Sequence, residues 1–274
     1  MTKKSDRVDP FYVFDSLREH RFIIGQLSKR AVRSRYRGTL LGVLWSLITP
    51  MVMLTIYTFV FGMVFNVRWV SEGSNNLDFA AILFSGMIVH SIFAECLTRA
   101  PTLITSNPQY VKKVVFPLET LPWVTLSTAF FQGMVSIAIL MGYLIFFAGG
   151  LSWAVLLLPI PLAALVPFCL GAGWLISSAA VYVKDIGQLM GLVSTVLFFL
   201  APILYPKTAL PEYLQGFLYL NPITVVIEES RKVLLWNEPL NWGVLAIYFA
   251  CGLLFAWLSL VWFQKTRKGF ADVL

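Results

Sequence analysis

Long apolar stretches without charged residues alternate with short polar segments along this chain. The stretches free, or nearly free, of Asp, Glu, Lys and Arg are 38–67, 79–97, 120–183, 186–206 and 239–264. A bilayer core about 30 Å thick takes roughly 20 helical residues at 1.5 Å each. The stretch 120–183 is long enough for two helices, and Gly149-Gly150 marks the turn between them. The pattern therefore predicts six membrane spans.

The spans are predicted to be helices rather than barrel strands. Strands of a membrane barrel alternate apolar and polar residues, whereas runs such as LLLPIPLAALV show no alternation. We therefore predict an all-α integral membrane protein with an N-terminal amphipathic interface helix and short external re-entrant helices. The predicted spans are about 38–67, 79–97, 120–148, 153–183, 186–206 and 239–264. The predicted segments outside them are 1–37, the cytoplasmic loop 98–119, the external segment 207–238 and the tail 265–274.

Lys and Arg are distributed unevenly between the two sides of this arrangement. Residues 1–37 contain ten of the 21, and the segments on the same side contain seven more, which makes 17 against four on the other side. Cytoplasmic segments of membrane proteins are enriched in Lys and Arg. Both termini are therefore predicted to lie in the cytoplasm.

The composition excludes several classes of protein. The chain is 58% hydrophobic and 13% charged, whereas ordinary globular domains contain about 25% charged residues. This excludes a soluble enzyme and a disordered chain. The sequence contains no GxxxxGK[ST], HExxH or GxSxG motif, and its three cysteines have no metal-ligand spacing. We therefore predict no catalytic residue, metal or cofactor in this chain, and no nucleic-acid partner.

The predicted spans contain almost no ionisable residues. Ion-coupled transporters bury acidic or basic groups within the membrane, so transport by this chain would need another energy source. His90 and Glu95 come nearest to an exception. Glu95 is predicted at the cytoplasmic end of its span. His90 either has a function or joins two helices by a hydrogen bond.

Aromatic residues are frequent, with 22 Phe, 10 Tyr and 9 Trp. Aromatic rings can stack on the apolar faces of sugars, and Tyr hydroxyls can hydrogen-bond sugars. The alternative is the aromatic belt at the membrane interface, which we favour for Trp69, Trp153 and Trp236. The candidates for lining a translocation path are Tyr57, Phe59, Phe198, Phe199 and Tyr205.

Three segments outside the spans contain further candidates. Residues 11–37 place apolar residues three, four or seven apart among arginines. This predicts an amphipathic helix on the cytoplasmic leaflet, whose charge serves either topology alone or an anionic ligand. In the loop 98–119, Asn107-Pro108 predicts the start of a short helix. That helix either docks a partner or belongs to a linker folded against the membrane.

The external segment 207–238 predicts two short apolar helices separated by Asn221-Pro222. Each is too short to span a bilayer, so they would lie in the interface or enter the bundle as re-entrant pieces. Glu228 is spaced to form an intrahelical ion pair with Arg231 or Lys232. A role as a gate is the sharper alternative.

Four blocks of this sequence resemble the permeases of type-two ABC exporters, specifically the polysaccharide and polyol-phosphate export group. The blocks are RYRGTLLGVLWSLITPMVMLTIYTFVFGMVF (35–65), NPQYVKKVVFPLETLP (107–122), FFLAPILYP (198–206) and LNPITVVIEESRKVLL (220–235). They occur in order over nearly the whole chain. The resemblance implies a homodimer in the bacterial inner membrane, joined by two copies of a separate ATPase subunit that binds ATP and Mg.

The resemblance also implies roles for particular residues. The coupling helix that receives the ATPase stroke would involve Asn107, Pro108, Tyr110, Lys112 and Lys113. The external gate would involve Asn221, Pro222, Glu228 and Arg231. Contacts to a lipid pyrophosphate would come from Arg33, Arg35 and Arg37, because the Arg fork matches phosphate oxygens.

The predicted function is therefore that of a permease subunit in an ATP-driven exporter. Its predicted cargo is a surface polysaccharide of O-antigen type, linked to a polyprenyl pyrophosphate. A permease for teichoic acid, a capsule chain or a drug is an alternative within the same class. A membrane-embedded enzyme or lipid-handling protein without an ATPase is an alternative from another class.

Overall fold

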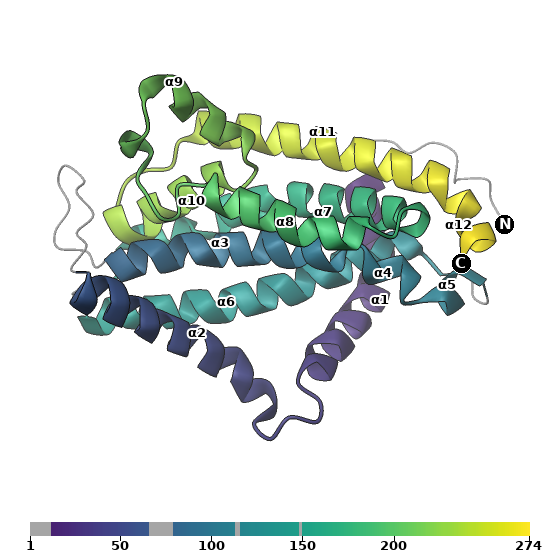
Figure 1. Ribbon diagram of the computed structural model, residues 1–274, viewed down its shortest axis with the longest axis horizontal. Coiled ribbons are helices and arrows are strands. Elements are labelled where there is room, and N and C mark those ends of the chain that lie inside the picture. The colour runs from purple at the N-terminus through teal and green to yellow at the C-terminus, as the bar shows by residue number, and fades with distance from the viewer. Residues whose placement is uncertain (1–11, 66–78, 113–115, 148–149) are drawn as a thin grey trace.

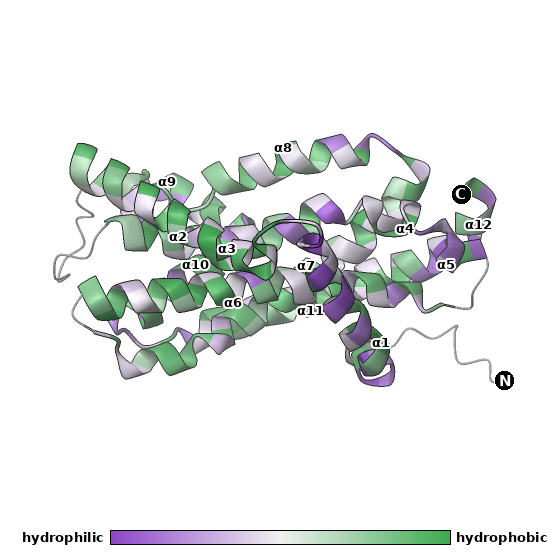
Figure 2. Cartoon of the chain, turned by 90° about the horizontal axis from the view of Figure 1, so that it is seen from below, coloured by the Kyte–Doolittle hydropathy of each residue, from purple (hydrophilic) through white to green (hydrophobic). Residues whose placement is uncertain are grey.

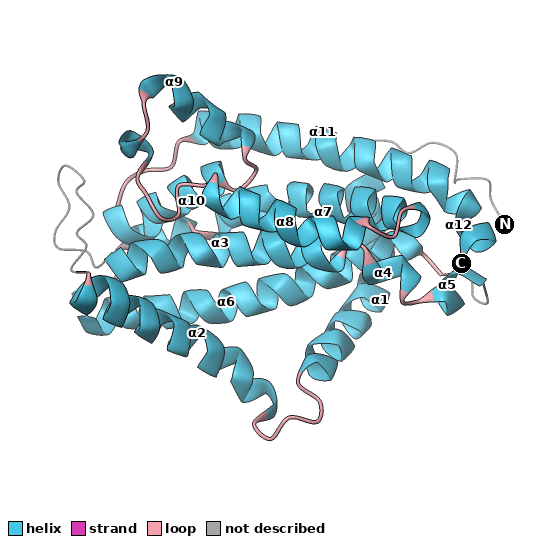
Figure 3. Ribbon diagram, viewed as in Figure 1, coloured by secondary structure: helices cyan, strands magenta, loops and turns pink. Residues whose placement is uncertain are grey.

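The computed structural model describes residues 12–65, 79–112, 116–147 and 150–274, and all regular structure in these ranges is helical (Figure 3). Five helical segments are long and apolar enough to cross a membrane by length and composition. The elements that contain them are α2 (Trp45–Tyr57) with its π-helical continuation Thr58–Val64, α3 (Phe79–Arg99), α6 (Leu121–Phe147), α7 (Pro159–Tyr182) and α11 (Trp242–Thr266). The predicted all-α membrane fold is confirmed.

The predicted fifth span is shorter than expected. Its helix, α8 (Ile186–Phe199), has 14 residues, about 21 Å at 1.5 Å per residue, and it ends before Pro206. The chain then turns through residues 200–206, where Pro202 and Pro206 cannot supply helical N–H groups. The count of six spans stays a prediction, since α8 alone is shorter than a bilayer core.

The long helices lie side by side, with α3 at the centre of the bundle (Figure 1). Helix α3 packs against α6, α7, α8 and α2, and most of its residues are buried. Helices α7 and α11 pack along each other closely. A Cβ atom at Gly171 would lie 3.1 Å from the Cα atom of Ala256, so this close approach requires a small residue.

The N-terminal segment forms the helix α1 (Tyr12–Arg35), as predicted. It kinks at His20, where the backbone departs from helical angles (φ −106°, ψ 15°). In Figure 1, α1 and α2 meet at a loop away from the bundle and form a V. Figure 2 shows α1 as largely hydrophilic, whereas α2 and α8 are mostly hydrophobic. Helix α1 is thus distinct in character from the spanning helices.

Short helices gather at the two ends of the bundle. One end contains α4 (Thr102–Thr105), α5 (Pro108–Lys112) and α12 (Phe270–Val273), and the other contains α9 (Glu212–Gln215) and α10 (Thr224–Arg231) (Figure 1). The predicted loop 98–119 and the predicted tail therefore share one end. The predicted external segment 207–238 lies at the opposite end, as the topology requires.

Candidate coupling, gate and lipid sites

The three arginines proposed for lipid pyrophosphate do not share one environment. Arg35 donates from Nη1 to both carboxylate oxygens of Glu95, at 3.0 and 3.1 Å, and Arg99 approaches the same carboxylate at 3.4 Å. Arg33 and Arg37 are exposed and form no ion pair with another residue in the described part of the chain. Arg35 therefore ties α1 to the end of α3, and the other two remain open to a ligand.

Gln132 of α6 is a polar link that the sequence analysis did not single out. It accepts a hydrogen bond from the Tyr36 hydroxyl at 2.9 Å and donates to the carbonyl of Ser46, also at 2.9 Å. It therefore fixes both sides of the loop between α1 and α2 to α6. Its signal in the sequence was its position, since it is a lone amide inside a long apolar run.

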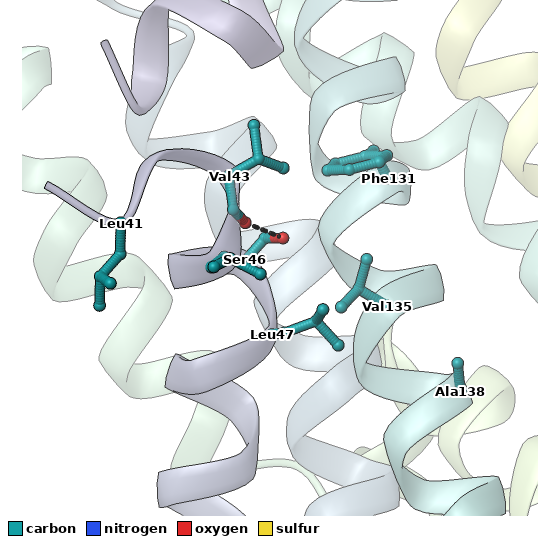
Figure 4. Close-up of a pocket in the computed structure, with 8 residues that line it drawn as sticks. Leu41, Val43, Ser46, Leu47, Phe131, Val135 and Ala138 are labelled. Carbon is teal, nitrogen blue, oxygen red and sulfur yellow. Dashed lines mark hydrogen bonds between the residues drawn. The ribbon is translucent and has the colours of Figure 1, made fainter. Parts of the chain in front are cut away.

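An apolar groove lies between the start of α2 and the middle of α6, with a volume of about 390 Å³. Figure 4 shows its side chains on α6 and on α2 with the turn that leads into it, and the Ser46 hydroxyl donates back to the Val43 carbonyl at 2.7 Å. The first lining residue, Leu41, comes four residues after the exposed Arg37 in the chain. Its lining residues are Leu41, Val43, Leu44, Ser46, Leu47, Phe131, Val135 and Ala138.

The coupling segment forms the predicted short helix, α5, beginning at Pro108. Asn107 donates from its side-chain amide to the carbonyl of Leu103 at 3.0 Å, which closes the end of α4. Tyr110 stacks on Phe116 with ring centroids 4.5 Å apart, and Lys112 is exposed. Lys113, also predicted here, lies outside the described residues.

A buried carboxylate lies next to the coupling segment, at the start of α6. The Glu119 side chain is 5% exposed and pairs with Arg267 at 2.8 Å, while the Glu119 carbonyl accepts from Trp174 Nε1 at 3.0 Å. The second guanidinium nitrogen of Arg267 donates to the carbonyl of Phe116 at 2.8 Å. Sequence reasoning missed this cluster because its residues lie far apart in the chain.

Arg231, a predicted gate residue, is buried to 2% exposure at the opposite end. Its guanidinium donates to the carbonyls of Pro202 and Ile203 in the turn after α8, and to the carbonyl of Ile82 in α3 at 3.0 Å. A Cβ atom at Gly86 would lie 2.9 Å from Nη2 of Arg231. Arg231 therefore joins α10, α3 and the broken end of α8.

The other predicted gate residues connect neighbouring parts of the same end. Asn221 donates to the carbonyl of Leu197 in α8 at 2.7 Å and accepts from the backbone N–H of Ile223 at 3.2 Å. The carbonyl of Pro222 accepts from the hydroxyl of Tyr248 in α11. These contacts place the Asn221-Pro222 turn against α8 and the spanning helix α11.

The ion pairs of α10 differ from the predicted pairing of Glu228 with Lys232. Lys232 pairs with Glu229 at 2.6 Å, because the buried Glu229 carboxylate also accepts from the backbone N–H of Asn241 and is held nearby. Glu228 accepts from the Tyr219 hydroxyl at 3.0 Å. That hydroxyl accepts from Lys207 Nζ at 2.6 Å.

Lys207 is a cation whose pKa this network raises. The hydrogen bond to Tyr219 raises the pKa of Lys207, the Glu228 charge raises it further, and partial burial opposes both. Nζ of Lys207 also lies 4.5 Å from the centroid of the Tyr219 ring. The segment 207–228 is thus linked by one exposed polar chain.

The five path aromatics fall into two groups on different helices. Tyr57 contacts Phe84 of α3 at 6.5 Å between ring centroids, and Phe198 contacts the His90 ring at 5.2 Å. Phe59 and Phe199 are more than half exposed. The hydroxyl of Tyr205 donates to the carbonyl of Phe199 at 2.9 Å. Each group therefore has one ring in contact with α3, Tyr57 or Phe198, and one exposed ring, Phe59 or Phe199.

His90 and the belt tryptophans show different degrees of burial. Nε2 of His90 lies 3.1 Å from the carbonyl of Ser194 in α8, which agrees with the interpretation of a helix–helix hydrogen bond. Trp153 is 88% exposed, and Trp236 is half-buried. Trp69 lies outside the described residues, and the aromatic belt stays a prediction.

The comparison with known protein families decides the class of this chain. The model of the ABC-2 type transporter family matches residues 24–235, which is more than half of the chain. The chain belongs to the ABC-2 type transporter family. It is a multi-pass membrane protein, with several apolar helices of spanning length.

Similar proteins that are named for export or transport match almost the whole length of this ABC-2 protein. It is 26% identical over 270 residues to the O-antigen export system permease protein RfbA of Klebsiella pneumoniae, covering 96% of both chains. It is 22% identical over 258 residues to the protein of the same name from Myxococcus xanthus, covering 93% of this chain and 96% of the relative. It is 23% identical over 247 residues to the polysialic acid transport protein KpsM of Escherichia coli, covering 87% and 91%.

The family match places the candidate sites of the ABC-2 protein within a shared core. Residues 24–235 include the coupling segment, the Arg35–Glu95 pair and Arg231. The match ends before α11 and α12. Within the described residues, no group of three or more His, Cys, Asp and Glu could hold a metal ion.

Proposed function

We propose that this ABC-2 protein is the permease subunit of an ATP-driven exporter for a lipid-linked surface polysaccharide of O-antigen type. The observation that carries the proposal is its similarity, over 96% of its length, to a permease named for O-antigen export. The chain has no phosphate-binding loop of its own. A separate cytoplasmic ATPase, present in two copies and binding ATP and Mg, therefore supplies the energy.

The coupling of ATP hydrolysis to transport is assigned to α5 and the residues around it. Helix α5 lies at the end of the bundle that the excess of Lys and Arg assigns to the cytoplasm. Its exposed side chains, Gln109 and Lys112, are available to a partner. The stacked pair Tyr110 and Phe116 connects α5 to the chain entering α6.

A second copy of this chain is proposed to complete the transport path. Helix α2 has few buried residues, and α8 has one, although both are apolar. Exposed rings on these helices, including Phe59 and Phe199, would face the partner copy or the passing glycan. The second copy would cover the apolar surface of α2 and α8 that a single chain leaves exposed.

The polyprenyl pyrophosphate of the cargo is proposed to bind where α1 meets α2. Arg33 and Arg37 are exposed and can pair with phosphate oxygens. The apolar groove after Arg37 can take an apolar chain of the lipid. Arg35 positions α1 rather than binding the pyrophosphate, because it already donates two hydrogen bonds to Glu95.

The test of the proposed function is deletion of the gene in its bacterial host. Finished glycan should accumulate on the cytoplasmic side of the inner membrane, and it should disappear from the cell surface. A normal surface glycan would contradict the proposal. Co-purification adds a second test, since a stoichiometric ATPase should accompany the permease, whereas a lipid-handling protein would lack one.

An acidic polysaccharide is a second candidate cargo. The relative that favours it is the polysialic acid transport protein KpsM. Analysis of the glycan retained by the deletion strain separates the two cargoes by charge. A teichoic acid would be recognised there by its phosphate content.

A further inference from the structure

The C-terminal segment of this protein folds back onto the coupling helix. After α11 ends at Thr266, the chain makes a 3₁₀ turn, Arg267–Gly269, and continues as α12. Helix α12 packs against α5 and α7. Figures 1 and 2 show α12 beside α5 at the same end of the bundle. The two short helices, which lie far apart in the sequence, therefore form one surface.

Arg267 links this segment to two residues, Phe116 and Glu119, in the stretch that leads into α6. Its guanidinium donates to the buried Glu119 carboxylate and to the carbonyl of Phe116, both at 2.8 Å. Phe116 is the residue on which Tyr110 of α5 stacks. A continuous path of contacts therefore runs from α11 through Arg267 and Phe116 to α5.

A second set of contacts fixes the segment to α7. The hydroxyl of Tyr182 donates to the carbonyl of Thr266 at 2.9 Å, and Phe270 is fully buried between Tyr182 and Phe263. A Cβ atom at Gly269 would lie 2.7 Å from the Tyr182 hydroxyl. The turn is therefore held closely and cannot move independently of α7.

A helix as short as α5 needs such support in order to transmit a displacement. It has five residues, and isolated helices shorter than about 12 residues are marginal in water. Its orientation must therefore come from tertiary contacts. Those contacts are the Tyr110–Phe116 stack, the bond that ties Asn107, the residue before α5, to Leu103 of α4, and the packing of α12.

We propose that residues 267–274 are a C-terminal brace, which holds α5 in the orientation from which the partner ATPase moves it. Arg267 is the positioning residue of this brace, acting through Glu119 and Phe116 rather than on the ATPase or the glycan. The proposal rests on the proposed function, since it assumes that α5 receives the ATPase stroke. The brace adds to that function a second role for Arg267. When the ATPase displaces α5, the Arg267 guanidinium passes the movement to α11 and α6 together.

The direct test is Arg267→Met, with Lys268→Met as the matched control. Lys268 is the next residue in the same turn, and its side chain is exposed. The permease is co-expressed with its ATPase, and the complex is reconstituted in liposomes with its lipid-linked glycan. In Arg267→Met the ATPase should remain bound and active, while glycan exported per ATP hydrolysed should fall about fivefold or more. The control should match the wild type.

Two further variants separate positioning from folding. Arg267→Lys keeps a cation that can reach one of the two acceptors, so it should recover part of the export per ATP. Tyr182→Phe removes only the bond to the Thr266 carbonyl and keeps the packing on Phe270, so it should lower the same ratio by less. Unchanged export per ATP in Arg267→Met would overturn the proposal, and so would proportional loss of hydrolysis and export.

Hydrogen exchange tests the brace without any transport measurement. In the purified permease, backbone amides of α5 should exchange faster in Arg267→Met than in the wild type, while those of α3 should not change. Equal exchange of α5 in both proteins would refute the brace. If instead the wild-type permease binds no ATPase, the proposed function fails, and the exchange result still reports on the contact between the two segments.

Discussion

The two ends of the bundle both bury charged side chains, and the buried Arg231 and the buried Glu119 are stabilised in different ways. At the end predicted to be external, Arg231 donates to backbone carbonyls of α3 and of the turn after α8. At the end predicted to be cytoplasmic, the Glu119 carboxylate pairs with the side chain of Arg267. Backbone acceptors are present whatever the sequence of those helices, whereas a side-chain partner can be removed or weakened.

This difference indicates which end of the bundle keeps its contacts and which end can change them. Arg231 supplies donors to carbonyls that the end of α8 leaves without helical partners, so its loss would expose several buried acceptors at once. The Glu119–Arg267 pair joins two helices through one contact whose cation is 32% exposed. We therefore expect the external end to contribute more stability, and the cytoplasmic end to be able to change its contacts during transport.

Replacing Arg231 is expected to have the largest effect on stability. Arg231→Met removes donors from buried carbonyls, and each bond to a charged group contributes about 1.5–3 kcal/mol, so the loss should exceed about 3 kcal/mol. For a protein of this size that corresponds to a fall of roughly 6–12 °C in the unfolding midpoint. The measurement is thermal unfolding of the purified protein in detergent.

The matched control for Arg231 is Lys184→Met, which removes an exposed cation and should leave the midpoint within about 1 °C, because exposed charges contribute little. Arg231→Lys should also be destabilised, since one ammonium group cannot reach all the carbonyls that the guanidinium fork reaches. An unfolding midpoint unchanged in Arg231→Met would show that the two ends do not differ as described.

Replacing Glu119 should have a smaller effect on stability than replacing Arg231. Glu119→Gln keeps an acceptor oxygen for Arg267 and removes the charge, so we expect a loss of about 1 kcal/mol. Arg267 is partly exposed and regains hydration when the ion pair weakens. Thermal unfolding of Glu119→Gln in detergent measures this loss of stability. A loss equal to that of Arg231→Met would contradict the comparison between the two ends.

The hydrophobic pattern predicted the five apolar helical segments of spanning length, but it could not predict which of their faces are buried. The first span, Gly42–Val64, and α3 have similar hydropathy, yet their most apolar windows are 11% and 72% buried. A lipid tail and a neighbouring apolar side chain select the same residue types. The pattern therefore shows that a segment is in the membrane, and says little about what covers it.

The candidate sites were predicted unevenly for a related reason. The start of α5 at Pro108 follows from local sequence, because proline is favoured at the first position of a helix. The partners of Arg35, Arg231 and Arg267 lie far away in the chain, and their spacing gives no local signal. The early end of α8 has a local signal in Pro202 and Pro206, whereas the binding of the carbonyls after it by Arg231 has none.

Neutralising Glu95 should affect ligand binding more than stability. Glu95→Gln weakens the bonds to Arg35 and Arg99, whose side chains are 36% and 41% exposed, so the loss of stability should stay under about 1 kcal/mol. Arg35 then becomes available beside Arg33 and Arg37. Liposomes containing a polyprenyl pyrophosphate should bind this variant more tightly than the wild type.

The control for Glu95 is the pair of variants Arg33→Gln and Arg37→Gln in the wild-type background. Each should weaken binding to the same liposomes, because an exposed arginine is removed from the proposed site. Weaker binding by Glu95→Gln would indicate that Arg35 acts on the ligand only through its attachment to α3. That result would show that the position of α1, rather than its number of free arginines, limits binding of the liposomes.

The smallest expected effect is the pH dependence that Lys207 gives to the external end. Its folded-state pKa lies above the ordinary value, first because of the bond to Tyr219 and then because of the Glu228 charge. A group whose pKa is raised by folding stabilises the fold fully below the unfolded pKa of about 10.4, and this contribution is lost as pH rises through the folded pKa.

The Lys207 contribution should therefore be constant between about pH 7 and pH 9 and decline above about pH 10.4. After allowance for solvent screening it amounts to a few tenths of a kcal/mol. The difference in unfolding midpoint between the wild type and Lys207→Met measures it and removes the titration of other groups. A difference that grows as pH rises would mean that Lys207 is held by contacts that do not depend on its charge. Unlike the fully buried Arg231, the half-buried Lys207 can adjust its end of the bundle without fixing it.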